Sequence, residues 1–236
     1  MTMRRLPTLA LLAAACSEPP PSRSAPFPSG PTERLTFPAA PRRELDLLFV
    51  IDNSGSTVEW QMALTAAFPV FLAGLRDDAG ALPDLHVGVV TTNLGSGGVP
   101  IGGCSTAARP DGDDGRLTNN GCAGIDGSFL RDGARADGTR DVNYTGLLPD
   151  RFRCMAQRGS SGCGFEASLG AMRRALEPGH NPGFLRGDAA LGIVIQTDED
   201  DCSVADPTFF GDPNATVAST LGPRTSFRCH EFGVQC

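Results

Sequence analysis

The sequence predicts an α/β fold, in which a doubly wound, mostly parallel sheet carries helices on both faces. Three short apolar runs, at residues 47–51, 85–92 and 190–196, have the length of strands that are buried on both faces. Segments with helical spacing of apolar residues separate them, and an alternation of strand and helix is typical of a parallel sheet. The chain has 236 residues, 40% of them hydrophobic, which suffices for one core of this kind.

The first run ends abruptly in the polar segment Asp52-Asn53-Ser54-Gly55-Ser56. In an open α/β sheet, ligands bind beyond the carboxyl ends of the strands. Asp52, Ser54 and Ser56 alternate along the chain, so a loop that curls over the strand end can direct their oxygens to one point. Such oxygen ligands suit Mg²⁺, Mn²⁺ or Ca²⁺ better than zinc or copper. The same composition is also that of an ordinary turn.

The third run ends in a second polar segment, Thr197-Asp198-Glu199-Asp200. In a doubly wound sheet, two strand ends of this kind meet where the strand order reverses. We therefore expect Asp52 and Asp198 at the same edge of the sheet. Asp200 and Asp201 add negative charge there, and a cation would relieve the repulsion among these carboxylates.

Apolar residues at helical spacing predict three helices. The first spans about residues 57–75, and Pro69 is expected to kink or divide it. The second spans about 147–157. The third begins near Gly164 and ends before Gly179 and Pro182. The expected inward face of the first helix consists of Trp60, Leu64, Phe68, Phe71 and Leu75, and that of the third of Phe165, Leu169, Met172 and Leu176.

A glycine- and aspartate-rich region interrupts this pattern after the second strand. Residues 93–143 nearly lack apolar periodicity, and loops of this length are usually functional or separately stapled. We expect an insertion over about 93–160. Residues 111–115 suggest a calcium loop, but the EF-hand spacing fails at Gly115, so a solvated turn is expected. His86 lies at the opposite end of its strand from the polar segments, which indicates a structural role.

The first 43 residues predict an exported protein. Arg4 and Arg5 precede an apolar run of signal-peptide length, so residues 1–15 are expected to be a signal peptide. The run ends in small residues before Cys16, which resembles a bacterial lipobox, although Leu12 is one place too early. We expect lipidation of Cys16, with ordinary secretion and cleavage near Ala15 as the alternative. The proline- and serine-rich segment 16–43 is expected to be a semi-extended tether.

The eight cysteines agree with export. They have neither paired Cys-x-x-Cys spacing nor histidine partners, so we expect disulfides rather than zinc. If Cys16 carries lipid, Cys236 is left over, which suggests a chain that continues beyond it. The sequence does not determine the connectivity of the other six. Pairing between neighbours in sequence would give Cys104–Cys122, Cys154–Cys163 and Cys202–Cys229.

The charge of the chain limits its partners. The net charge is −7, the pI is about 4.9 and no basic cluster occurs, so we expect no nucleic-acid partner. All twenty basic residues are arginine, which excludes chemistry that requires a lysine. We expect contact with a membrane only through the N-terminal lipid.

The segment from Asp52 to Ser56 resembles the Asp-x-Ser-x-Ser motif of von Willebrand factor A domains, which form a metal-ion-dependent adhesion site. Thr197-Asp198 is similar to the family's Thr-Asp-Gly motif, with Glu199 in place of glycine. The resemblance covers about residues 44–201 and implies that residues 44–236 form one domain. A full domain of this family has two further strands and helices after Asp198, which are either absent here or lie beyond Cys236.

The resemblance also implies a set of metal ligands. Ser54 and Ser56 would bind the ion directly, Asp198 through a water, and Asp52 would ligate it or hold its waters. Glu166 lies where the family has a ligating threonine. We expect Glu166 to be a ligand, which would make the site more anionic and more tolerant of Ca²⁺ or Mn²⁺. Alternatively, it caps the N-terminus of the following helix.

The resemblance implies a non-catalytic binding module in which a partner protein supplies a carboxylate to the ion. With the lipobox, tether and insertion, the chain is similar to outer-membrane lipoproteins of GC-rich Gram-negative bacteria such as myxobacteria. A structural envelope protein with a degenerate site is one alternative. A metal-dependent phosphatase is another, but Ser54 stands where haloacid-dehalogenase-type enzymes need a second aspartate, and no other catalytic motif occurs.

Overall fold

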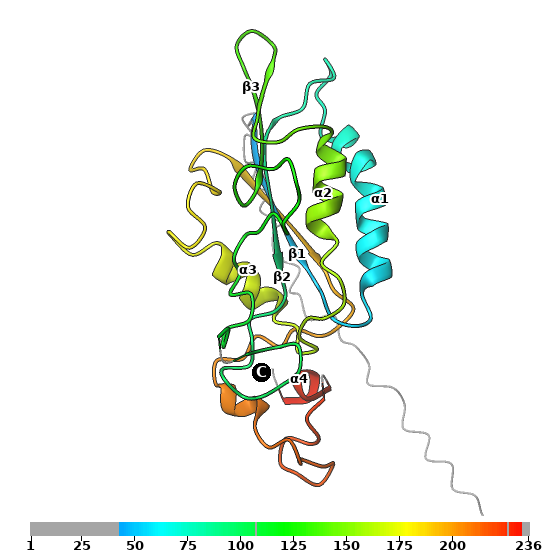
Figure 1. Ribbon diagram of the computed structural model, residues 1–236, viewed down its shortest axis with the longest axis vertical. Coiled ribbons are helices and arrows are strands. Elements are labelled where there is room, and N and C mark those ends of the chain that lie inside the picture. Colours follow the sequence, from blue (N-terminus) through cyan, green and yellow to red (C-terminus); the bar gives the residue numbers. More distant parts are fainter. Residues whose placement is uncertain (1–42, 107, 226, 233–236) are drawn as a thin grey trace, which may run out of the picture. The chain divides into compact units, whose positions relative to one another are not determined.

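A computed structural model describes residues 43–106, 108–225 and 227–232 (Figure 1). The predicted signal peptide, Cys16, the tether up to residue 42 and Cys236 lie outside the described residues. The helices are α1 (Val58–Gly74), α2 (Leu148–Ala156), α3 (Ser168–Ala175), α4 (Phe227–Phe232) and the 3₁₀ turn η1 (Pro207–Phe210). The strands are β1 (Glu44–Ile51), β2 (Asp84–Thr91), β3 (Leu130–Ala134), β4 (Arg140–Val142) and β5 (Ala190–Gln196). None of the described helices is both long and apolar enough to cross a membrane.

The described strands form one mixed sheet in the order β4-β3-β2-β1-β5. β1 lies between β2 and β5 and runs parallel to both. β3 and β4 extend the sheet in antiparallel pairing beyond β2. Because β1, β2 and β5 are parallel, their carboxyl ends lie at one edge of the sheet. The predicted α/β fold is therefore confirmed, with a parallel centre and an antiparallel extension.

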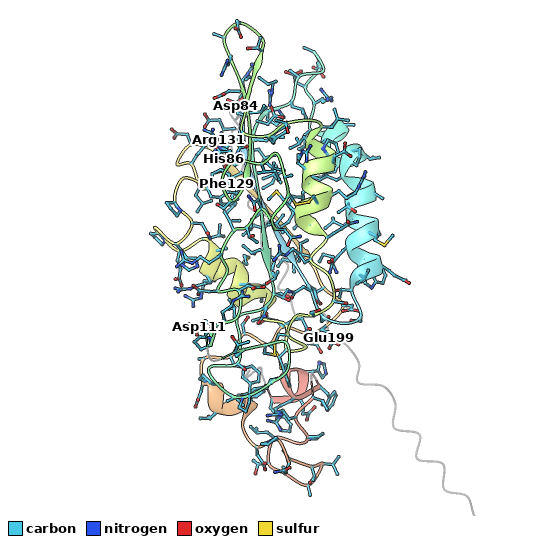
Figure 2. The ribbon with its side chains drawn as sticks, viewed as in Figure 1. Asp84, His86, Asp111, Phe129, Arg131 and Glu199 are labelled. Carbon is cyan, nitrogen blue, oxygen red and sulfur yellow. A yellow bond between two sulfur atoms is a disulfide. The ribbon has the colours of Figure 1, made fainter. Side chains whose placement is uncertain are left out.

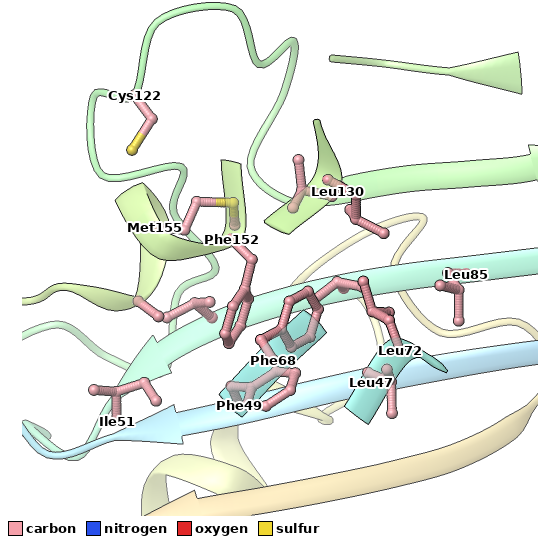
Figure 3. Close-up of a cluster of buried hydrophobic side chains, with 14 residues drawn as sticks. Leu47, Phe49, Ile51, Phe68, Leu72, Leu85, Cys122, Leu130, Phe152 and Met155 are labelled. Carbon is pink, nitrogen blue, oxygen red and sulfur yellow. The ribbon is translucent and has the colours of Figure 1, made fainter. Parts of the chain in front are cut away.

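Helices cover both faces of β1. Leu47, Phe49 and Ile51 face the cluster formed with α1 and α2, while Leu48 and Val50 face α3. The rings of Phe49, Phe68 and Phe152 lie at the centre of the first cluster, and Figure 3 shows their packing over β1 and β2. Because successive side chains of β1 are buried on opposite faces of the sheet, every position from Leu47 to Ile51 is apolar.

The predicted division of the first helix at Pro69 is wrong, because α1 is continuous from Val58 to Gly74. Its predicted inward face is also wrong in part. Trp60 is 57% exposed and Phe71 39% exposed, whereas the polar Gln61 and Thr65 are buried beside Phe68 and Leu72. α1 is apolar around most of its circumference, so the spacing of apolar residues does not define its buried side.

Three further expectations are corrected. α3 begins only at Ser168, and it buries the small residues Ala171 and Ala175 while Leu169 is exposed. The expected loop 93–143 contains the β3–β4 hairpin, which Asp132 holds by accepting bonds from Arg140 and Tyr144 rather than through an apolar pattern. β5 is not buried on both faces: it is an edge strand whose exposed side chains alternate with half-buried ones.

The three disulfides are Cys104–Cys163, Cys122–Cys154 and Cys202–Cys229. Pairing between neighbours in sequence is thus wrong for four of the six cysteines. Cys104 pairs with Cys163 in the segment before α3, and Cys122 pairs with Cys154 of α2. His86 makes a hydrogen bond of 2.7 Å between Nδ1 and the carbonyl of Phe184, in a contact far from the carboxyl ends of the strands. Figure 2 shows His86 and Asp84 toward one end of the structure and Glu199 toward the other.

Candidate metal centre

Asp52 is fully buried at the carboxyl end of β1, and both of its carboxylate oxygens accept hydrogen bonds. The Ser54 amide donates to Oδ1 at 2.8 Å, and the Thr197 hydroxyl donates to Oδ2 at 2.8 Å. The second bond joins the end of β1 to the end of β5. The carbonyl of Asp52 is held in turn by the side chains of Thr57 and Gln61, each at 2.8 Å.

The two serines and Asp198 lie next to one another at this edge. The hydroxyl oxygens of Ser54 and Ser56 are 3.5 Å apart, and the Ser56 hydroxyl donates to Asp198 Oδ1 at 3.2 Å. Ser54 is buried, whereas Ser56 and Asp198 are exposed. The oxygens therefore run from the buried end of β1 to the surface. Asp52, Ser54, Ser56 and Asp198 are brought together, as the strand order requires.

Glu166 approaches the same group from the segment before α3. It is 1% exposed, and neither carboxylate oxygen has a hydrogen-bond partner among the described residues. Burial, and next the negative charge of Asp52, raises the pKa of Glu166 to about 8. The Ser54 hydroxyl lies close enough to oppose this shift without meeting hydrogen-bond geometry. A carboxylate in this position lacks a counter-charge that a cation would supply.

The alternative role of Glu166 as a helix cap is not observed. Ala167 occupies the N-cap position of α3, and the first-turn amides of Leu169 and Gly170 donate instead to Asp201 Oδ1 at 2.8 Å and to the Ser203 hydroxyl at 2.6 Å. The backbone of this segment is held on both sides instead. The Cys202 amide donates to the Glu166 carbonyl at 2.6 Å, and the Ala167 amide donates to the Thr92 carbonyl at 2.9 Å. Glu166 is thus fixed between the ends of β2 and β5 by main-chain contacts.

A small core of disulfides and aromatic rings supports the Glu166 segment. It consists of Cys104, Cys163, Phe165, Cys202, Phe210 and Cys229, all buried. Phe165, next to Glu166 in sequence, packs on Phe210 of η1 with ring centroids 5.1 Å apart. Cys104–Cys163 lies before Glu166 in the chain and Cys202–Cys229 lies after it, so these two disulfides flank the residue in sequence.

The donor set fits a hard divalent cation better than zinc or copper. Within the part of the chain that the structure describes, no group of three or more histidine, cysteine, aspartate or glutamate side chains is arranged to hold a metal ion. Any ion here would depend on the serine hydroxyls together with the carboxylates. Oxygen-only ligands of this kind suit Mg²⁺, Mn²⁺ or Ca²⁺. The unpartnered Glu166 oxygens are the observation that favours a bound cation.

Three neighbours of the candidate site were not predicted as part of it. Thr197 bonds to Asp52, and its place before Asp198 was the available signal. Gln61 is buried and bonds to Asp52, to the Gly159 carbonyl and to the amides of Arg158 and Gly159. Thr92, at the end of β2, is buried with a hydroxyl that has no partner among the described residues.

Comparisons of the chain with protein-family models, with curated proteins and with solved structures find no match.

Proposed function

We propose that this protein is a non-catalytic binding module that holds a divalent cation, Mg²⁺ or else Mn²⁺ or Ca²⁺, at the edge where β1 and β5 end. Asp52, Ser54, Ser56, Glu166 and Asp198 are the proposed ligands. The observation that carries the proposal is the buried Glu166 carboxylate, which has no hydrogen-bond partner among the described residues and whose pKa is raised in part by the charge of Asp52. The similarity of these motifs to von Willebrand factor A domains supports the same conclusion.

The arrangement of the ligands suggests how a partner would bind. Asp52, Ser54 and Glu166 are buried, whereas Ser56 and Asp198 are exposed. An ion bound by these residues would be reached from the side of Ser56 and Asp198, where a partner protein could supply a carboxylate. The ion would supply the positive charge for this contact, since the surrounding side chains are acidic.

Calorimetry with each cation alone tests the proposal. The unchanged chain is expected to bind Mg²⁺, Mn²⁺ or Ca²⁺ and to melt at a higher temperature in its presence. Asp52→Ala and the double variant Ser54→Ala, Ser56→Ala are expected to lose this shift. Asp78→Asn, which removes an exposed carboxylate far from the site, is the matched control and is expected to keep it. An absence of binding for all three cations contradicts the proposal and favours a structural protein with a degenerate site.

We also propose that the protein is exported and anchored to the outer membrane through lipid on Cys16. Three disulfides within the described residues support an oxidising compartment, because such bonds are rare in the cytosol. Labelling with a radioactive fatty acid in a Gram-negative host tests the anchor. Cys16→Ser is expected to abolish the label and to release the protein from the membrane fraction. Labelling of the Cys16→Ser chain would contradict the proposal.

A further inference from the structure

Thr92 lies beside Asp52, at the carboxyl end of the neighbouring strand. β1 and β2 are both interior strands of the described sheet, and they pair in parallel with Ile51 level with Thr91. The Thr92 amide continues this ladder by one residue, because it donates to the Ile51 carbonyl at 3.1 Å. The register therefore sets Thr92 level with Asp52, at the usual spacing of adjacent strands, about 5 Å.

The side chains of Asp52 and Thr92 belong to the same face of the sheet. Val50 of β1 and Val90 of β2 pack in the cluster that α3 covers. Alternate residues of a strand share a face, so Asp52 and Thr92, each two places further along, also lie on the α3 side. Thr91 lies on the other side, where its hydroxyl donates to Asp113.

The Thr92 hydroxyl is buried without a partner. Thr197, the neighbour of Asp52 on the β5 side, donates its hydroxyl to Asp52 Oδ2 at 2.8 Å. Thr92 is 0% exposed, yet its hydroxyl has no hydrogen-bond partner among the described residues. The same holds for both oxygens of Glu166, and the amide of Ala167 ties that segment to the Thr92 carbonyl at 2.9 Å. Burial of such groups is costly unless a ligand satisfies them.

We propose that Thr92 is a further ligand of the cation and that the site it completes prefers Ca²⁺ to Mg²⁺, an inference that rests on the proposed cation site. The hydroxyl adds an oxygen without adding negative charge. Calcium takes about six to eight oxygens and accepts bidentate carboxylates, whereas magnesium keeps several waters. Thr92 and Glu166 are each at most 1% exposed, which leaves little room for water. Both Glu166 oxygens lack partners among the described residues and can bind one ion together.

Calorimetry of the full chain with Ca²⁺ alone and with Mg²⁺ alone tests the proposal. The parent is expected to bind Ca²⁺ more tightly. Thr92→Val keeps the shape of the side chain without its hydroxyl and is expected to weaken Ca²⁺ binding by about tenfold or more. Thr92→Ser restores a hydroxyl and is expected to restore most of the affinity. Thr91→Val is the matched control and is expected to bind like the parent, because the Thr91 hydroxyl is used by Asp113.

Melting without cations separates a ligand from a structural residue. Thr92→Val loses no hydrogen bond within the described residues and is expected to melt no lower than the parent, whereas Thr91→Val loses its bond to Asp113 and is expected to melt lower.

Luminescence lifetimes of Eu³⁺, an oxygen-binding ion close to Ca²⁺ in size, in H₂O and D₂O count the waters on the bound ion. Thr92→Ala opens space for a water and is expected to add about one, and Thr91→Ala none. A parent that binds Mg²⁺ more tightly, Ca²⁺ binding that Thr92→Val leaves unchanged, or an unchanged water count in Thr92→Ala would overturn this inference alone. A parent that binds no cation would overturn the proposed function with it.

Discussion

At the scale of single residues, Glu166 is a buried carboxylate of the candidate site that has no hydrogen-bond partner among the described residues. A buried carboxylate without a hydrogen-bond donor or counter-charge is stabilised by protonation, which is why its pKa rises to about 8. Near neutral pH it is therefore mostly uncharged in the absence of a cation. A bound cation would reverse this balance, because the ionised form would then have a partner.

Replacing Glu166 by Gln is expected to separate stability from cation binding. The folded-state pKa of about 8 lies above the usual glutamate value of 4.5, so the stabilisation from protonated Glu166 is complete below pH 4.5. It is lost as the pH rises through 8, by at most about 1.4 kcal/mol per pH unit. Without cations, Glu166→Gln is expected to gain stability relative to the parent as pH rises from 5 to 9, in urea unfolding series. A constant difference would contradict the pKa shift.

Cation binding by the parent chain is expected to release a proton near neutral pH. Because Glu166 is protonated below about pH 8 and ionised as a ligand, affinity should rise with pH up to that value. Calorimetry in two buffers with different ionisation enthalpies measures the released proton directly. Glu166→Gln is expected to bind more weakly and to release none. Proton release that persists in Glu166→Gln would assign it to another group.

At the scale of elements, Gln61 links the site to the rest of the fold. Its side chain joins the end of β1 to the segment that follows α2, through the carbonyls of Asp52 and Gly159 and the amides of Arg158 and Gly159. These bonds lie in the interior, where an unpaired amide or carbonyl is costly. The inward position of a polar residue on α1 is explained by this set of partners.

Gln61→Ala is therefore expected to reduce the free energy of unfolding by about 3 kcal/mol, since several buried groups lose their partner. Thr65→Ala on the same buried face of α1 is the control, because within the described residues the Thr65 hydroxyl bonds only to the Met62 carbonyl of its own helix. That change is expected to cost about 1 kcal/mol. Chemical unfolding monitored by circular dichroism measures both. Equal losses would remove the special role given to Gln61.

Elements defined by local runs of apolar residues can be predicted from the sequence. Elements and contacts that depend on hydrogen bonds between distant residues cannot. The three predicted strands lie within one residue of β2 and β5 and within three residues of β1, because apolar runs define them. The β3–β4 hairpin was missed, since Asp132, Arg140 and Tyr144 hold it through side chains. The convergence of Asp52 and Asp198 follows from strand order alone. The partners of Gln61 come from a segment about one hundred residues away, which no local pattern reveals.

At the scale of the whole molecule, the disulfides divide into two classes by what they support. Cys104–Cys163 joins the insertion to the segment just before Glu166, in the small core with Phe165. Cys122–Cys154 instead joins two parts of the insertion, the loop before β3 and α2, and Cys122 belongs to the main core with residues of that helix. Only the first class holds a proposed ligand in place.

Removing either disulfide is expected to destabilise the fold to a similar extent. Loops of 59 and 32 residues correspond to about 4 kcal/mol each in the chain-entropy account. Stability alone therefore cannot distinguish them, but cation affinity can. The pair Cys104→Ser, Cys163→Ser is expected to weaken binding at least tenfold, because the Glu166 segment loses its attachment. The pair Cys122→Ser, Cys154→Ser is expected to bind normally at temperatures where it remains folded. If both pairs weaken binding alike, Glu166 is positioned by the fold as a whole and not by its adjacent disulfide.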